Sequence, residues 1–152
     1  MYAVLGVHFW RSRWHGDGVP QRRGMHGWER AALLMALLAH GAVLHRELFP
    51  GVGMHFGFGT ALSLMVWLAV LFYWIENFFS RLDGLHTFVM PAAAICAFLP
   101  GLFPPPHLLE QASSPAFRAH FIVAMLAYSL FTLATLHAVL MSIAEKRLHH
   151  AR

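Results

Sequence analysis

The chain has 152 residues, of which 58% are hydrophobic and only 12% are charged. Since an average soluble domain carries about 25% charged residues, this composition excludes an ordinary soluble globule and indicates an integral membrane protein. The net charge is +4, but eight of the eleven lysines and arginines lie in residues 1–30 and 144–152, beside apolar segments. This arrangement is typical of membrane topology signals and argues against nucleic-acid binding. Cys96 is the only cysteine, which excludes an internal disulfide, a CxxC redox site and a CxxCH haem attachment.

The chain begins with an apolar segment, residues 1–10, that is only half as long as a membrane span and runs directly into Arg11. It has neither the preceding positive charge nor the small-residue cleavage site of a signal peptide. We interpret it as the inner end of a helix whose start is missing from the chain. An interfacial helix is the alternative interpretation.

Four longer apolar segments follow, with expected bounds of 28–49, 56–78, 85–103 and 117–144. Each comes near or exceeds the roughly 20 residues that a helix needs to cross a membrane, and Pro91 is expected to kink the third. The segments are apolar at both odd and even positions, which excludes the strands of a transmembrane barrel. The predicted fold is an all-α polytopic transmembrane helix bundle, with four full spans plus a partial N-terminal span. It forms a single membrane domain over residues 1–152.

Basic residues between the segments predict the orientation. Nine of them fall on one expected side of the membrane and only Arg46 and Arg118 fall on the other. The nine are Arg11, Arg13, Arg22, Arg23, Arg30, Arg81, Lys146, Arg147 and Arg152. By the positive-inside rule their side is cytoplasmic, so the C-terminus is expected in the cytoplasm.

Twelve histidines are unusual in a membrane protein, and histidine is a common ligand of haem iron. His45, His55, His107 and His120 are expected near the outer ends of the spans. His45 and His120 both lie about 5 to 6 Å inside the apolar layer, a depth at which two imidazoles could bind one iron. His40 lies about 13 Å deep and is turned about 140° from His45 around the helix. For His40 the alternative is a packing role, with a hydrogen bond to a neighbouring carbonyl or hydroxyl group.

Residues 114–131, SPAFRAHFIVAMLAYSLF, resemble the cytochrome c assembly family of the CcsA and HemX type. Supporting similarity lies in residues 28–34, 55–63 and 91–94. In that family a histidine at the outer start of a helix, followed eight residues later by tyrosine, is associated with haem handling. His120 matches this histidine, and His40 matches a histidine that recurs in the HemX-like branch. The resemblance covers most of this chain but only the N-terminal half of the family pattern.

The resemblance implies a multi-pass protein of the bacterial inner membrane that is not an enzyme. Such a cytochrome c biogenesis factor binds haem and presents it at the outer face. His120 is then the candidate ligand of the haem iron, with His40 and His45 as further haem-binding candidates, and Arg118 is the candidate partner of a haem propionate. The implied partners are membrane lipid, haem, and other cytochrome c assembly subunits or the missing C-terminal half.

Two other functions fit the sequence. A cytochrome b-like electron-transfer subunit would need paired histidines at one depth, a condition that only His45 with His120 roughly meets. A purely structural subunit or a transporter half-bundle would need no cofactor at all.

Overall fold

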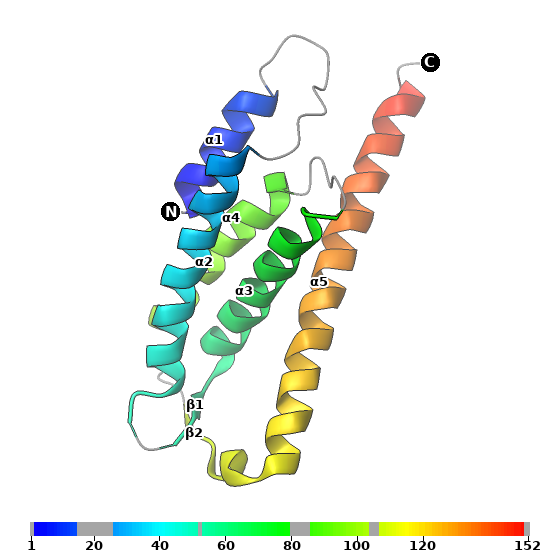
Figure 1. The fold of residues 1–152 in the computed structure, drawn as a ribbon. Helices are drawn as coiled ribbons and strands as arrows, with labels where there is room; N and C mark the ends of the chain where they lie inside the picture. Colours follow the sequence, from blue (N-terminus) through cyan, green and yellow to red (C-terminus); the bar gives the residue numbers. More distant parts are fainter. Residues whose placement is uncertain (1, 15–25, 52, 80–85, 104–106, 151–152) are drawn as a thin grey trace.

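The computed structural model describes residues 2–14, 26–51, 53–79, 86–103 and 107–150, which form a set of helices with one short antiparallel strand pair (Figure 1). The long helices are α1 (Tyr2–Trp14), α2 (Gly27–Leu48), α3 (Phe58–Glu76), α4 (His86–Cys96) and α5 (Pro115–His150). The shorter elements are β1 (His55–Phe56), η1 (Leu99–Gly101), β2 (His107–Leu108) and η2 (Glu110–Ser113).

Helix α3 is central, because it packs against α2, α4 and α5, while α1 packs mainly against α4. In Figure 1, α1 lies at the upper left of the bundle and α4 lies lower, between α2 and α3 in this view. The buried core comes from all five helices. Where several core residues lie on one helix, they recur three or four residues apart, so one face of that helix packs inward. The members of the core are Tyr2, Leu5, Leu33, Ala36, Leu37, Val66, Ala69, Val70, Tyr73, Val89, Met90, Ala93 and Leu133.

Three of the described helices are long and apolar enough to cross a membrane: Gly27–Leu48, Phe58–Glu76 and Pro115–Ile143. The predicted segment 85–103 instead contains the 11-residue helix α4, which holds Pro91, and then the short η1. At 1.5 Å per residue α4 is about 16 Å long, roughly half the apolar thickness of a membrane. The sequence-based expectation of four full spans therefore goes further than the helices of the structure do.

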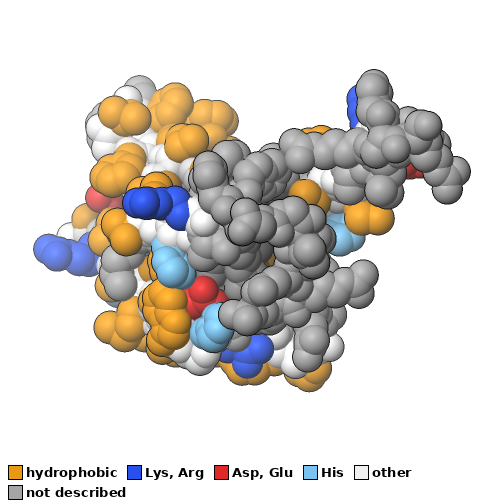
Figure 2. All heavy atoms as spheres, turned by 90° about the horizontal axis from the view of Figure 1, so that it is seen from above, with side chains coloured by type: hydrophobic (Ala, Val, Ile, Leu, Met, Phe, Trp, Pro, Cys, Tyr) orange, Lys and Arg blue, Asp and Glu red, His pale blue; other side chains and the backbone are white. Residues whose placement is uncertain are grey.

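The outer surface of the helices is apolar. Phe131 of α5 is 71% exposed and Phe98, which precedes η1, is 74% exposed, and large apolar side chains are exposed on all the other long helices as well. Seen from above, hydrophobic side chains gather on the left and lower part of the molecule, with a small group of histidine, basic and acidic side chains between them (Figure 2). Such extensive apolar exposure is typical of helices that face lipid or other membrane helices.

Helices α2 and α3 are joined by indole hydrogen bonds as well as by apolar packing. Trp67 Nε1 donates to the carbonyl oxygen of Leu37 (2.8 Å), and Trp74 Nε1 donates to that of Arg30 (3.1 Å). Both pairs are seven residues apart along their helices, about two turns, so the two bonds repeat along one antiparallel interface. Gly41 faces the Trp67 ring, and a Cβ atom at position 41 would lie 3.1 Å from it.

The two ends of the bundle differ in their chemistry. The end of α2 and the starts of α3 and α5 meet at the strand pair, which we call the hairpin end, and there Arg46 and Arg118 lie. The opposite end, which we call the basic end, carries Arg11, Arg30 and Lys146. Of the residues that predict the orientation, Arg22, Arg23, Arg81 and Arg152 lie outside the described residues.

Candidate functional site

A short strand pair shapes the hairpin end. His55 of β1 pairs with Leu108 of β2, Phe56 pairs with His107, and the N–H of Leu109 donates to the carbonyl oxygen of Met54 (2.8 Å). The sequence did not predict this strand pair, because two-residue strands leave no alternation to detect.

Gly53 fixes the turn that leads into β1. Its φ of +93° lies in the left-handed region, which glycine adopts without steric cost. A Cβ atom at position 53 would lie only 2.6 Å from Leu108 Cδ1. The chain therefore needs glycine here to bring the loop after α2 against β2.

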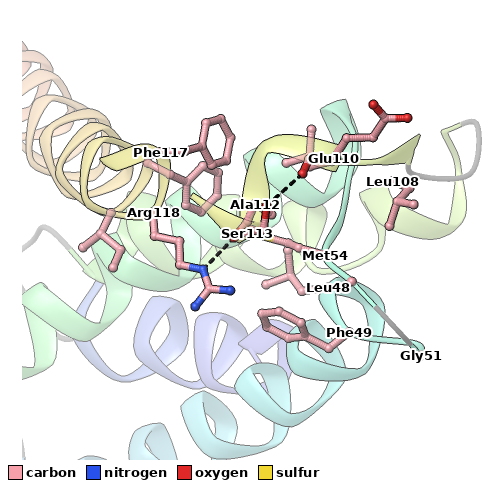
Figure 3. A pocket seen from close by; sticks show the side chains of 14 residues that line it. Leu48, Phe49, Gly51, Met54, Leu108, Glu110, Ala112, Ser113, Phe117 and Arg118 are labelled. Atoms are coloured by element: carbon pink, nitrogen blue, oxygen red, sulfur yellow. Dashed lines mark hydrogen bonds between the residues drawn. The ribbon is translucent and has the colours of Figure 1, made fainter. Parts of the chain in front are cut away.

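A pocket of about 740 Å³ opens at the hairpin end (Figure 3). This volume falls within the usual range of small-molecule and cofactor sites, about 300–1,000 Å³. Its lining comes from the end of α2, both sides of the strand pair, η2 and the first turns of α5. Most of these side chains are apolar: Leu48, Phe49, Met54, Leu108, Leu109, Ala112, Phe117, Phe121 and Ile122; the others are Gly51, Gly53, Glu110, Ser113 and Arg118.

Arg118 is the cationic side chain of this lining. Its Nε donates to the carbonyl oxygen of Ala112 (2.6 Å), which ties η2 to the first turns of α5. In Figure 3 the carboxylate of Glu110 points away from Arg118. The guanidinium carries further N–H donors beyond Nε, so the pocket wall presents a fixed positive charge beside apolar and aromatic surface.

Aromatic contacts hold the α5 side of the pocket. The ring of Phe121 meets Phe56 of β1 edge to face at 4.8 Å and is stacked with Phe117 at 6.2 Å. Both distances are in the range of favourable aromatic pairs. The predicted start of the last span, residue 117, missed the first two residues of α5, which begins at Pro115, a residue type suited to the first turn of a helix.

The predicted iron ligands His45 and His120 are not part of the pocket lining. His45 is in the last turn of α2, exposed, with its ring 5.4 Å from that of Phe49. His120 is exposed in α5, between the lining residues Arg118 and Phe121 in the sequence. The two helices both pack on α3, and among the described residues no group of three histidine, cysteine or acidic side chains is placed to hold a metal ion.

His40 has a different environment, in the interior of the bundle. It is 7% exposed, and its Nε2 lies 2.9 Å from Ser63 Oγ of α3. The ring also meets Tyr2 of α1 edge to face at 5.6 Å. The structure thus gives His40 a hydrogen bond to a neighbouring hydroxyl, far along α2 from the hairpin-end pocket.

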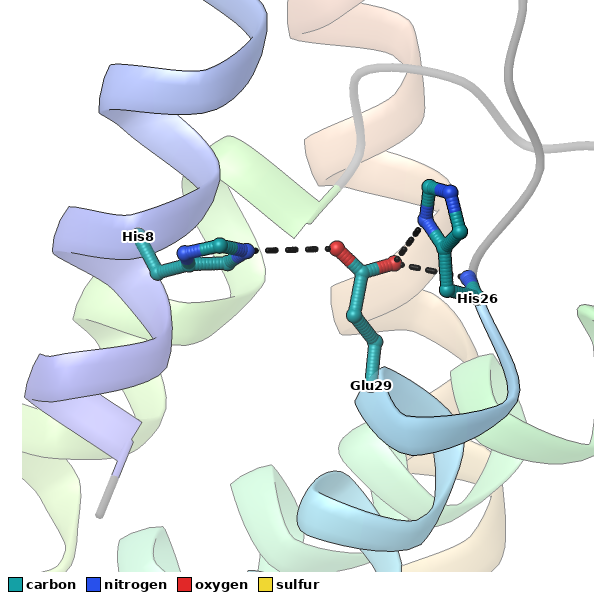
Figure 4. A network of polar contacts seen from close by, with 3 residues as sticks. All are labelled: His8, His26 and Glu29. Carbon is teal, nitrogen blue, oxygen red and sulfur yellow. Dashed lines mark hydrogen bonds and ion pairs between the residues drawn. The ribbon is translucent and has the colours of Figure 1, made fainter.

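His8 and His26 flank a buried carboxylate at the basic end (Figure 4). Glu29 is 3% exposed; its Oε1 lies 3.4 Å from His8 Nε2 and its Oε2 lies 3.4 Å from His26 Nδ1. The backbone N–H of His26 donates to Glu29 Oε2 (2.8 Å), the geometry of a glutamate at the third position of a helix. The three-residue spacing between His26 and Glu29 can be read from the sequence, whereas the contact with His8 depends on how α1 packs.

Comparison of the chain with protein-family models, with curated proteins and with solved structures found no significant match.

Proposed function

We propose that the chain is a membrane subunit that handles haem at its hairpin end, in the manner of a cytochrome c biogenesis factor. The observation that carries the proposal is the pocket of about 740 Å³, whose lining is mainly apolar and aromatic with the guanidinium of Arg118 on its wall. Arg118 also belongs to the segment 114–131 that resembles the cytochrome c assembly family. Haem combines a flat apolar macrocycle with carboxylate side chains, and this lining offers a counterpart to both parts.

The lining residues suit the macrocycle and the propionates of haem better than they suit its iron. Phe117, Phe121 and Leu48 suit the macrocycle and Arg118 suits a propionate, but the described residues that line the pocket include no histidine. The candidate iron ligand is His120, which is exposed in α5 and belongs to the segment 114–131 that resembles the cytochrome c assembly family. Haem bound in this way would supply a redox-active iron, and an exposed ligand is compatible with a cofactor that is received and passed on. His45 is the second candidate ligand.

The proposal extends to the membrane topology. Three helices meet the length for a crossing. We propose that α4 and η1 together carry the chain across as a fourth span, and that α1, 13 residues long, covers only the half of the membrane on the basic side. The hairpin end then faces outward from a bacterial inner membrane and the C-terminus is cytoplasmic, with other assembly subunits as partners. No catalytic residue is part of the proposal.

A second candidate function is a structural membrane subunit without a cofactor. It is favoured by the bond between His40 and Ser63, which accounts for an intramembrane histidine through helix packing alone. It also agrees with the position of His45 and His120 outside the pocket lining.

Titration of the purified full chain in detergent with haem, followed through the Soret band, tests the proposal. Arg118→Gln should weaken binding about tenfold, the effect of losing one charge-assisted hydrogen bond. His120→Ala should shift the Soret band and weaken binding further. The matched controls are Arg46→Gln and His137→Ala, which change exposed residues outside the pocket and should leave the titration unchanged. Absence of a Soret shift in the unmodified chain overturns haem handling and leaves the structural role.

A further inference from the structure

A polar cluster lies within the bundle, away from the pocket, where three helices bring one side chain each. Tyr2 of α1, His40 of α2 and Ser63 of α3 are 5%, 7% and 0% exposed. His40 connects the other two, because its Nε2 bonds to Ser63 Oγ at 2.9 Å and its ring meets the Tyr2 ring edge to face at 5.6 Å. Leu37 and Val66, which lie near His40 and Ser63 in sequence, belong to the apolar core.

Two polar atoms of this cluster have no hydrogen-bond partner among the described residues: Tyr2 Oη and His40 Nδ1. Both are buried, and both belong to side chains that are more than nine-tenths buried. Buried polar atoms in native proteins are almost always paired, with protein groups or with ordered water. In a membrane interior bulk solvent cannot supply the partner.

The chemistry of the two atoms defines what would satisfy both. A neutral imidazole has one nitrogen that donates and one that accepts, so the role of Nδ1 is set by the bond that Nε2 makes with Ser63. A phenolic hydroxyl both donates and accepts. A ligand for this place must therefore be small and neutral and must be able to donate and accept at once. Water meets these conditions, and buried waters in proteins typically make two to four such bonds.

We propose that the bundle binds one structural water molecule between His40 Nδ1 and Tyr2 Oη. The water extends the His40–Ser63 bond into a chain of polar contacts that reaches α1 and fixes the first turn of α1 against α2 and α3. This site requires no haem and lies apart from the hairpin-end pocket, so its test does not depend on the proposed function.

Removing the hydroxyl of Tyr2 tests the proposal, because a hydroxyl bonded to water and an unpaired hydroxyl predict different changes in the midpoint of thermal unfolding. If Tyr2 Oη bonds to a bound water, Tyr2→Phe removes that bond and lowers the midpoint of thermal unfolding of the full chain in detergent by several degrees. If the hydroxyl is simply unpaired, Tyr2→Phe removes a buried polar atom without a partner and leaves the midpoint unchanged or raises it. Tyr128→Phe is the matched control, because Tyr128 is an exposed tyrosine of α5 and its change should leave the midpoint where it is.

A direct measurement on the unmodified chain avoids dependence on a variant that folds poorly. Nuclear Overhauser transfer from water to the ring protons of His40, in protein labelled at histidine, should be observed in the unmodified chain and lost or weakened in Tyr2→Phe. No transfer to the His40 ring in the unmodified chain overturns the proposal. Transfer that persists unchanged in Tyr2→Phe, or an unfolding midpoint that does not fall in that variant, overturns the bridging role of Tyr2.

Discussion

Trp74 in α3 donates its indole N–H to the carbonyl oxygen of Arg30 in α2, at a distance of 3.1 Å. That carbonyl lies near the start of α2, so the bond fixes the basic end of α2 to the end of α3. The guanidinium of Arg30 donates in turn to the carbonyl oxygen of Asn77 (3.3 Å) and lies 4.9 Å from the centre of the Phe78 ring. Each of the two helix ends thus donates one side-chain hydrogen bond to a backbone carbonyl oxygen of the other.

Trp74→Phe should destabilise the bundle by about 1 kcal/mol, because phenylalanine keeps an aromatic ring and loses the indole donor. Trp67→Phe should have a similar effect through Leu37, and the double variant should lose about the sum, since the two bonds are two helical turns apart. Thermal unfolding in detergent measures the loss. Trp28→Phe is the control, because Trp28 is exposed. Equal midpoints for all of these proteins would show that the indole bonds contribute nothing.

Gly59→Ala should destabilise the chain by about 1 to 3 kcal/mol, because a Cβ atom at position 59 would lie 2.8 Å from the carbonyl oxygen of Leu99. The contact is with backbone, so α3 and η1 must move apart to accept the methyl group. Gly27→Ala is the matched control, since a Cβ atom there meets nothing within 4 Å. Chemical denaturation in mild detergent compares the two, and a Gly59→Ala variant as stable as Gly27→Ala contradicts the close approach of η1.

Glu29→Gln should destabilise the packing of α1 on α2 by about 1 to 3 kcal/mol, because the amide removes the negative charge that faces His8 and His26. Limited proteolysis of the segment between α1 and α2 provides the measurement, with faster cleavage expected in the variant. Glu145→Gln changes an exposed carboxylate of α5 and should be cleaved at the original rate. An unchanged cleavage rate in Glu29→Gln would show that this carboxylate does not contribute to the packing of α1 on α2.

The sequence predicted the helices that are long and continuous, and it did so for a physical reason. Three of the four expected spans, 28–49, 56–78 and 117–144, correspond to α2, α3 and α5, because uninterrupted apolar runs and the charges at their ends are sequence-local. Their bounds agree within two residues except at the end of α5, which continues to His150. The segment 85–103 also lacks Asp, Glu, Lys and Arg, yet its helix α4 ends at Cys96 and the chain continues as η1. Composition alone could not distinguish a straight helix from a broken one.

The candidate site was predictable only in part. Arg118 and the helix start around it were found from residues 114–131, and Arg118 does line the pocket. The remaining lining depends on Leu48, Met54 and Leu108 coming together from three segments, and that meeting is set by the strand pair and by the turn at Gly53. The expected similarity in depth of His45 and His120 used distance along the helix axis only. Direction around each helix decides which side chains face a pocket, and here the facing positions include Phe117, Arg118, Phe121 and Ile122.

The last prediction concerns the orientation in the membrane. We expect the basic end to be cytoplasmic, because nine lysines and arginines are assigned to that side by sequence and only Arg46 and Arg118 to the other. Single cysteines introduced into a Cys96→Ala background provide the measurement: Ser114→Cys at the hairpin end and Lys146→Cys at the basic end, both exposed positions. In intact bacterial cells a membrane-impermeant maleimide should label Ser114→Cys and spare Lys146→Cys until the membrane is opened with detergent. The Cys96→Ala parent should stay unlabelled throughout, and labelling of Lys146→Cys in intact cells with protection of Ser114→Cys would reverse the assigned orientation and place the pocket on the cytoplasmic side.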